Sequence, residues 1–335
     1  MADVTTFLGG VTNSGLISVS GHEDGLGIEV GPIATFLGGI TSSGTILASG
    51  VTQNGTGIAT GGIGTFLGGI TNTGLIAATG NLNAIGIEAV NIATFLGGIT
   101  NAGTIDTSAA TVKAVGIFAF GIQSFSGGIL SSGTIVSLTS ANSVRPGAGI
   151  EVDTVPTFLG GITNSGAITV SASGQASGIE VATISTFLGG ITNSGTIQVT
   201  SAAAGAFGIS APGITAFSGG ITNTGLLSVV AQGHAGGINI RTISTFLGGV
   251  TNAGTIQVTS TGTNVIGIDA LSVGTFSGGI ANSGLLRAIA SGTDFGIDLA
   301  SIATFQGGIT NSGTIQVTAA FANASGITAP SVTTF

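Results

Sequence analysis

Apolar residues recur along this chain in a pattern that repeats about every thirty positions. The clearest marker is a Phe, and successive members of the series are 29 or 30 residues apart, except for one gap of 33. The series is Phe7, Phe36, Phe66, Phe95, Phe125, Phe158, Phe187, Phe217, Phe246, Phe276, Phe305 and Phe335. A period of this size predicts a solenoid, in which one supersecondary unit is stacked many times along a single axis.

Each of the eleven units places its other apolar residues and its glycines at fixed distances from Phe. Gly-Gly begins two residues after Phe, Ile or Val follows at four, Gly at eight and Ile or Leu at ten. The Ile of a Gly-Ile pair lies eight residues before the next Phe, and Ile or Val lies three before it. Short alternating segments separated by Gly or Asn predict strands and turns, and so many Gly exclude a helical stripe. We expect about three strands per unit: one around Phe-x-Gly-Gly-Ile-Thr, one at Gly-Thr-Ile-x-Val and one at Gly-Ile-x-Val.

These elements predict an all-β fold, a parallel and right-handed β-helix of about eleven coils of 29–33 residues. Each strand pairs with its equivalent in the next coil, so that Phe stacks on Phe and Ile on Ile in a narrow core. Residues 1–335 then form one domain, a rod on the order of 50 Å long at ~4.8 Å per coil. The variation in unit length falls just before the Gly-Ile pair, which predicts a loop along one edge of the coil.

Asn occupies the position six residues after Phe in nine units, and the other two carry Ser42 and Ser131. Asn tolerates the backbone conformation of a tight bend. Its amide can also bond to the Asn one coil away, so we expect an internal amide ladder.

The unit Gly-Gly-Ile-Thr-Asn-Ser-Gly-Thr-Ile, as at residues 189–197, resembles the passenger repeats of bacterial autotransporter and related surface adhesins. The resemblance covers essentially the whole chain. It implies a β-helical fold and an extracellular or cell-surface location, and it implies little about activity. No export signal is visible in the segment from Met1 to Phe7.

The sequence begins and ends in the same phase of the repeat, at Val-Thr-Thr-Phe, and we expect no capping unit at either end. Open end coils favour head-to-tail stacking of subunits into a homopolymer. The expected subunit interface consists of Val4, Phe7, Val11, Ile17, Ile28, Ile315, Ile327, Val332 and Phe335. The alternative is an excised passenger segment of a larger surface adhesin.

Composition narrows the classes of partner. The 42% hydrophobic and 5% charged residues are unlike a disordered chain, and no run approaches the ~18 apolar residues of a membrane span. The formal net charge of −8 argues against nucleic-acid binding. The absence of Cys excludes thiol chemistry and disulfides.

Half of the twelve acidic residues share one column, directly after the Gly-Ile pair: Glu29, Glu88, Glu151, Glu180, Asp269 and Asp298. Strand alternation points this column outward. The neighbouring pairs Glu151/Glu180 and Asp269/Asp298 are weak candidates for a Ca²⁺ site or a glycosidase carboxylate pair. The competing interpretation is a solvated column that keeps the rod soluble.

The remaining polar residues indicate no catalytic constellation. His22 and His234 lie in variable segments, where exposed loop His is expected, and the four basic residues do not align into a patch. Columns of Thr on either side of Phe suit an outward strand face, with ice binding as a remote alternative.

We therefore expect a structural, non-enzymatic fibre or adhesin subunit without a cofactor, whose partners are itself and candidate cell-surface or glycan ligands. The alternative is a glycan-binding or carbohydrate-active β-helix. That function would need acidic and aromatic residues clustered in one groove, and no such cluster is evident along the chain.

Overall fold

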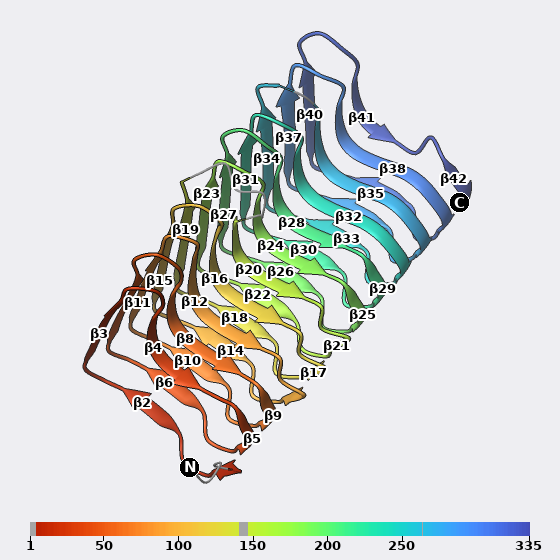
Figure 1. Ribbon diagram of the computed structural model, residues 1–335. Coiled ribbons are helices and arrows are strands. Elements are labelled where there is room, and N and C mark those ends of the chain that lie inside the picture. Colours follow the sequence, from red (N-terminus) through yellow and green to blue (C-terminus); the bar gives the residue numbers. More distant parts are fainter. Residues whose placement is uncertain (1–4, 141–146, 263) are drawn as a thin grey trace.

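The computed structural model describes residues 5–140, 147–262 and 264–335. These residues form a parallel β-solenoid of eleven coils and contain no helix, as the repeat predicts. Figure 1 shows the coils stacked in chain order along one axis, with the N-terminus at one end and the C-terminus at the other. We number the coils from 1 to 11, each beginning at a Phe of the repeating series. Within the described residues, no helix is long and apolar enough to cross a membrane.

Two of the three sheets take one strand from every coil. Sheet B contains β2 (Val11–Asn13), β6 (Ile40–Ser42), β10 (Ile70–Asn72), β14 (Ile99–Asn101), β18 (Ile129–Ser131), β22 (Ile162–Asn164), β26 (Ile191–Asn193), β30 (Ile221–Asn223), β33 (Val250–Asn252), β36 (Ile280–Asn282) and β39 (Ile309–Asn311). Sheet C contains β3 (Leu16–Gly21), β7 (Thr45–Gly50), β11 (Leu75–Gly80), β15 (Thr104–Ala109), β19 (Thr134–Thr139), β23 (Ala167–Ala172), β27 (Thr196–Ser201), β31 (Leu226–Ala231), β34 (Thr255–Ser260), β37 (Leu285–Ala290) and β40 (Thr314–Ala319).

Sheet A is wider, because each coil crosses it in two segments that meet at a bend. The first row holds the Gly-Ile motif: β4 (Gly25–Val30), β8 (Gly55–Gly61), β12 (Asn83–Val90), β16 (Lys113–Phe120), β20 (Gly147–Asp153), β24 (Ala176–Ala182), β28 (Ala206–Pro212) and β41 (Ala324–Thr328). The second row holds the repeating Phe: β1 (Thr6–Phe7), β5 (Ile33–Phe36), β9 (Ile63–Phe66), β13 (Thr94–Phe95), β17 (Ser124–Phe125), β21 (Thr157–Phe158), β25 (Ile184–Phe187), β29 (Ile214–Phe217) and β42 (Val332–Thr334). Three strands run through both rows: β32 (Ala235–Phe246), β35 (Val265–Phe276) and β38 (Asp294–Phe305).

The strand expected around Phe-x-Gly-Gly-Ile-Thr is wrong in one respect: it is two strands, in sheets A and B. The Gly-Gly pair between them turns the chain from one sheet to the other. Gly190 shows why glycine is needed, since its φ is +72° and a Cβ there would lie 2.5 Å from the carbonyl oxygen of Gly219. A side chain at this corner would separate adjacent coils.

The repeating Phe residues form one axial column, as expected. Ring centroids of neighbouring coils are 4.6–5.2 Å apart from Phe7 to Phe335. The ring planes vary between nearly parallel and nearly perpendicular, so the column is set by the backbone register and not by face-to-face stacking. The rings of Phe36 through Phe305 are at most 1% exposed.

The Asn column forms the predicted amide ladder inside the corner between sheets B and C. Asn164 donates its amide N–H to Asn193 Oδ1, Asn193 donates to Asn223, and Asn223 donates to Asn252, each at 2.8 Å. The same amides also reach backbone carbonyls of the turn, such as Gly195 O at 3.3 Å from Asn193 Nδ2. The ladder is interrupted where Ser42 and Ser131 precede an Asn: the buried Oδ1 atoms of Asn72 and Asn164 accept no hydrogen bond from any described residue. Elsewhere the bonds between amides compensate for burying polar groups.

The bend in sheet A is a feature that the repeat pattern did not predict. One residue in each of coils 1 to 10 adopts a positive φ there, including Thr154, Thr183 and Thr242 at 55–56°. A β-branched residue rarely takes this conformation, so the bend is imposed by the two rows packing on the same core. Residues of the bend, among them Gly31, Gly62 and Asn91, line hollows on the outer face of sheet A.

Candidate functional site

The acidic column lies on the first row of sheet A and points away from the Phe core, as predicted. The strand register places Glu151 beside Glu180 and Asp269 beside Asp298. The column is only partly solvated. Glu29 is exposed, and Glu88, Glu180 and Asp298 are half-buried, whereas Glu151 is only 8% exposed and Asp269 only 2%. The interpretation of the column as a solvated surface therefore does not hold for Glu151 and Asp269.

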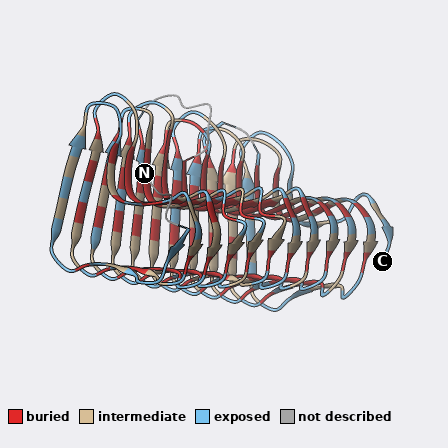
Figure 2. Cartoon of the chain, turned by 60° about the horizontal axis from the view of Figure 1, so that its bottom comes forward, coloured by how far each residue is buried: buried red, intermediate tan, exposed pale blue. Residues whose placement is uncertain are grey.

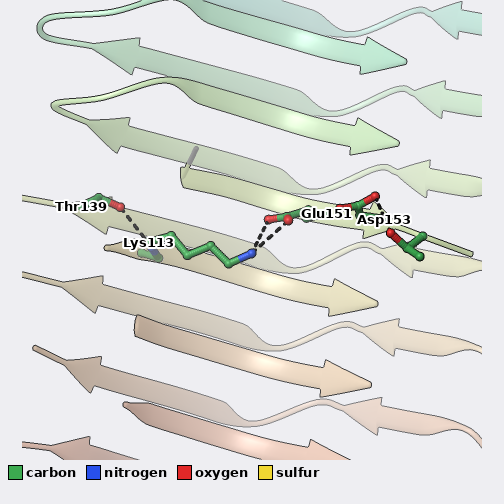
Figure 3. Close-up of polar contacts among 6 residues, drawn as sticks. Lys113, Thr139, Glu151 and Asp153 are labelled. Atoms are coloured by element: carbon green, nitrogen blue, oxygen red, sulfur yellow. Dashed lines mark hydrogen bonds and ion pairs between the residues drawn. The ribbon is translucent and has the colours of Figure 1, made fainter. Parts of the chain in front are cut away.

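Glu151 is held by a buried ammonium group from the neighbouring coil. Lys113 Nζ lies 2.9 and 3.1 Å from the two carboxylate oxygens of Glu151, and both side chains are buried. Figure 3 shows the Lys113 side chain reaching along β16 toward Glu151 on β20. The same ammonium group is 3.8 Å from the ring centroid of Phe118, a favourable cation–π distance.

Two other carboxyl groups of the column, those of Glu88 and Glu180, have raised pKa values. Burial, and then the charge of Glu151, raise the pKa of Glu180 to about 7. Burial also raises the pKa of Glu88, although the charge of Lys113 opposes the shift. Glu180 therefore exchanges its proton near neutral pH, whereas ordinary surface carboxyl groups lose theirs near pH 4.

The carboxylates of the second acidic pair, Asp269 and Asp298, are each bonded to a side chain of a neighbouring coil. Arg241 Nε donates to Asp269 Oδ2 at 3.0 Å, and Arg241 Nη2 donates to His234 Nε2 at 3.3 Å. Thr328 donates its hydroxyl to Asp298. Burial, and then the charge of Arg241, lower the pKa of His234. His234 is half-buried and bonded to Arg241, which corrects the expectation of an exposed loop His. His22 is exposed, as expected.

These contacts weaken the metal hypothesis for Glu151, Glu180, Asp269 and Asp298. At least one carboxylate of each pair is already bonded to a protein group. Over residues 5–140, 147–262 and 264–335, no three His, Asp or Glu side chains come together as metal ligands.

A hollow on this face lies over coils 3 and 4 and has a volume of about 530 Å³. Two further hollows, of about 320 and 230 Å³, extend from it toward coil 1, and Glu88 lines all three. We call this connected concavity the sheet A groove. Its chief polar and aromatic lining residues over coils 3 and 4 are Asn83, Glu88, Asn91, Lys113, Phe118 and Phe120.

Phe118 and Phe120 were not recognised as site residues from the sequence. They are outside the repeating Phe series and project outward from β16, with ring centroids 5.8 Å apart. Their spacing of two on a strand was a usable signal, since it places both rings on one face. The diagonal pairing of Arg241 with Asp269 was also available from the register.

The expected subunit interface divides into exposed and buried members. Phe7 is 38% exposed, Ile327 44% and Phe335 72%, whereas Val11, Ile17, Ile315 and Val332 are half-buried against the core. Ile28 is only 7% exposed and belongs to the core of coil 1, so it offers little surface to another subunit. Val4 lies outside the described residues.

Comparisons with known protein families, curated proteins and solved structures find no match for this chain.

Proposed function

We propose that this chain is a structural, non-enzymatic subunit of an extracellular or cell-surface fibre, in which copies stack end to end. The observation that carries the proposal is the constant register of the three parallel sheets and the Phe column, which a further coil could continue at either end. Figure 2 shows exposed and intermediate residues on the outermost strands, in contrast to the buried interior. Covering these strands with another coil would remove apolar surface from water and continue three parallel sheets.

The two end faces of the solenoid carry the two ends of the same Phe column and of the same three sheets. The Phe column ends at Phe7 on one face and at Phe335 on the other, so that stacking would continue it at the spacing found inside the rod. The amide ladder also has a direction, since each bonded Asn donates toward the next coil in sequence. These features favour head-to-tail contacts, which extend a filament without closing it.

Sedimentation velocity and negative-stain microscopy of the purified chain over a concentration series test the proposal. We expect end-to-end particles whose length grows with concentration. Phe335→Asp should suppress them, because it places a charge on the exposed end of the core column. The matched control is Leu188→Asp, a half-exposed position in the middle of the rod, which should leave assembly unchanged.

Single rods of uniform length at every concentration would contradict self-assembly. That result would favour the alternative in which the end coils are covered by further repeats of a larger surface adhesin.

A further inference from the structure

We propose that the sheet A groove over coils 1 to 4 is a binding site for a neutral oligosaccharide, with Phe118 and Phe120 as its platform. The proposal does not depend on end-to-end assembly, because the groove lies on the side of the rod.

The aromatic pair is the first support. Phe118 and Phe120 lie on the same face of β16, with their rings inclined by only 18°. Phe120 is 36% exposed, whereas the repeating residues from Phe36 to Phe305 are at most 1% exposed. The two rings stack on each other and Lys113 Nζ lies over Phe118, so Phe120 provides the exposed apolar surface of the pair. This surface beside a hollow suits the apolar face of a pyranose ring.

The polar groups around this platform are the second support. Glu88 and Asn91 flank the aromatic pair on the coil 3 side, and Asn83 lies at the start of the same strand. The amide nitrogen of Asn83 donates to Asn54 at 2.8 Å, which fixes the orientation of that side chain. Carboxyl and amide groups arranged around an apolar surface can donate to and accept from sugar hydroxyls.

Charge selects for a neutral ligand. An anion in the groove would meet the carboxyl group of Glu88, and Asp24 lines the adjoining hollow. The ammonium group of Lys113 lies against the Phe118 ring and is paired with the carboxylate of Glu151, so that these two charges cancel. With this pair neutral overall, hydroxyl-rich neutral ligands suit the platform better than charged ones.

The shape of the groove indicates a chain of sugars. The hollow of about 530 Å³ is within the roughly 300–1,000 Å³ typical of small-molecule sites. It continues past Glu88 into hollows of about 320 and 230 Å³ that reach Glu29 and Asp24 of coil 1. An oligosaccharide lying across several coils would fill this length, and a monosaccharide would fill only part of it.

Isothermal titration calorimetry and saturation-transfer NMR test the proposal, since the chain has no Trp or Tyr for a fluorescence assay. The probes are neutral hexasaccharides of glucose, mannose and xylose, their disaccharides, and charged controls of galacturonate and glucosamine hexamers. We expect at least one neutral hexasaccharide to bind with a Kd near or below about 1 mM. It should bind more tightly than its disaccharide and than either charged hexamer.

The platform is tested with Phe120→Ala, which should weaken binding of that hexasaccharide about tenfold. Phe120→Tyr keeps the ring and should bind within about threefold of the native chain. The matched control is Phe321→Ala, which removes a ring that is 89% exposed in coil 11, away from the groove. Circular dichroism of each variant confirms that the β-sheet content is unchanged.

Three outcomes would overturn the proposal: no neutral probe binds up to about 10 mM, a charged hexamer binds best, or Phe120→Ala binds as tightly as Phe321→Ala. None of these outcomes bears on end-to-end assembly, which sedimentation measures separately.

Discussion

Replacing Asn193 with Asp tests whether the amide ladder stabilises the solenoid. Asn193 is fully buried, and its amide nitrogen donates to Asn223 Oδ1 at 2.8 Å and to the carbonyl oxygens of Gly195 and Leu226 at 3.3 and 3.4 Å. An ionised Asp cannot donate, so it would face these three acceptors with a negative charge. Loss of the buried donor together with an uncompensated charge should destabilise the surrounding coils by about 3–5 kcal/mol at pH 7.

The effect should depend on pH with a defined sign. Burial raises the pKa of the new carboxyl in the folded state above its value of about 4 in the unfolded chain. The protonated acid can donate to Asn223, so the destabilisation should be small below about pH 4 and grow as the pH rises. Asn193→Ser is the matched control, because Ser42 and Ser131 occupy the same column, and it should cost only about 1–2 kcal/mol.

Hydrogen exchange measured by mass spectrometry is the appropriate assay, since a long repeat array need not unfold in one step. Amides of β26 and β30 should lose protection in the Asp variant, and those of β2 and β39 should change little. The reasoning fails if the Asp variant is no less protected than the Ser variant at pH 7, or if its protection is the same at pH 4 and pH 7.

Three further predictions follow from the core and the groove. Phe187→Ala removes a ring with no exposed surface and should destabilise the central coils by about 3–5 kcal/mol. The same exchange experiment measures this loss, and a destabilisation of less than about 1 kcal/mol would contradict a packed Phe column. The pKa of Glu180 is raised to about 7, so the folded state retains a proton that the unfolded chain releases near pH 4.5. The contribution of this group to the free energy of unfolding should therefore fall by on the order of 3 kcal/mol between pH 4.5 and 7. Urea unfolding of Glu180→Gln should lack that part of the decline, and a pH profile identical to that of the native chain would refute the assignment. Lys113→Met removes the buried ammonium group that pairs with Glu151 and should lower the free energy of unfolding by about 3–5 kcal/mol. Much of this loss should be recovered in the double variant that also carries Glu151→Gln. Thermal unfolding measures both variants, and equal stability of the two would contradict a coupled pair.

The columns of the solenoid could be predicted from the sequence because each depends only on the repeat period and on strand alternation. Phe187 and Asn193 are examples: their partners are the residues one unit earlier and later. The separation of the Phe strand from the following Ile-Thr-Asn strand was missed, since the apolar pattern continues across the Gly-Gly corner and does not reveal which sheet each half joins.

The groove could not be predicted because it depends on the bend in sheet A. The residues at the bend are Gly, Asn, Ser or Thr, and Thr183 carries no local signal for a positive φ. Strand alternation alone places Glu151 in solvent, whereas the folded chain buries it beside Lys113. Lys113 and Glu151 are also 38 positions apart in the sequence, because the one unit of irregular length lies between them. Their contact therefore could not be found from the repeat period of about thirty residues.

All changes of unit length occur at one corner, between the strands of sheet C and the first row of sheet A. Insertions there leave the Phe and Asn columns untouched, because both columns are built from other segments of the coil. Each coil can therefore present its own peptide at this edge, and neighbouring peptides would be held in fixed order at a pitch of ~4.8 Å. The length and sequence of this edge can therefore change one coil at a time without altering the packing of the interior.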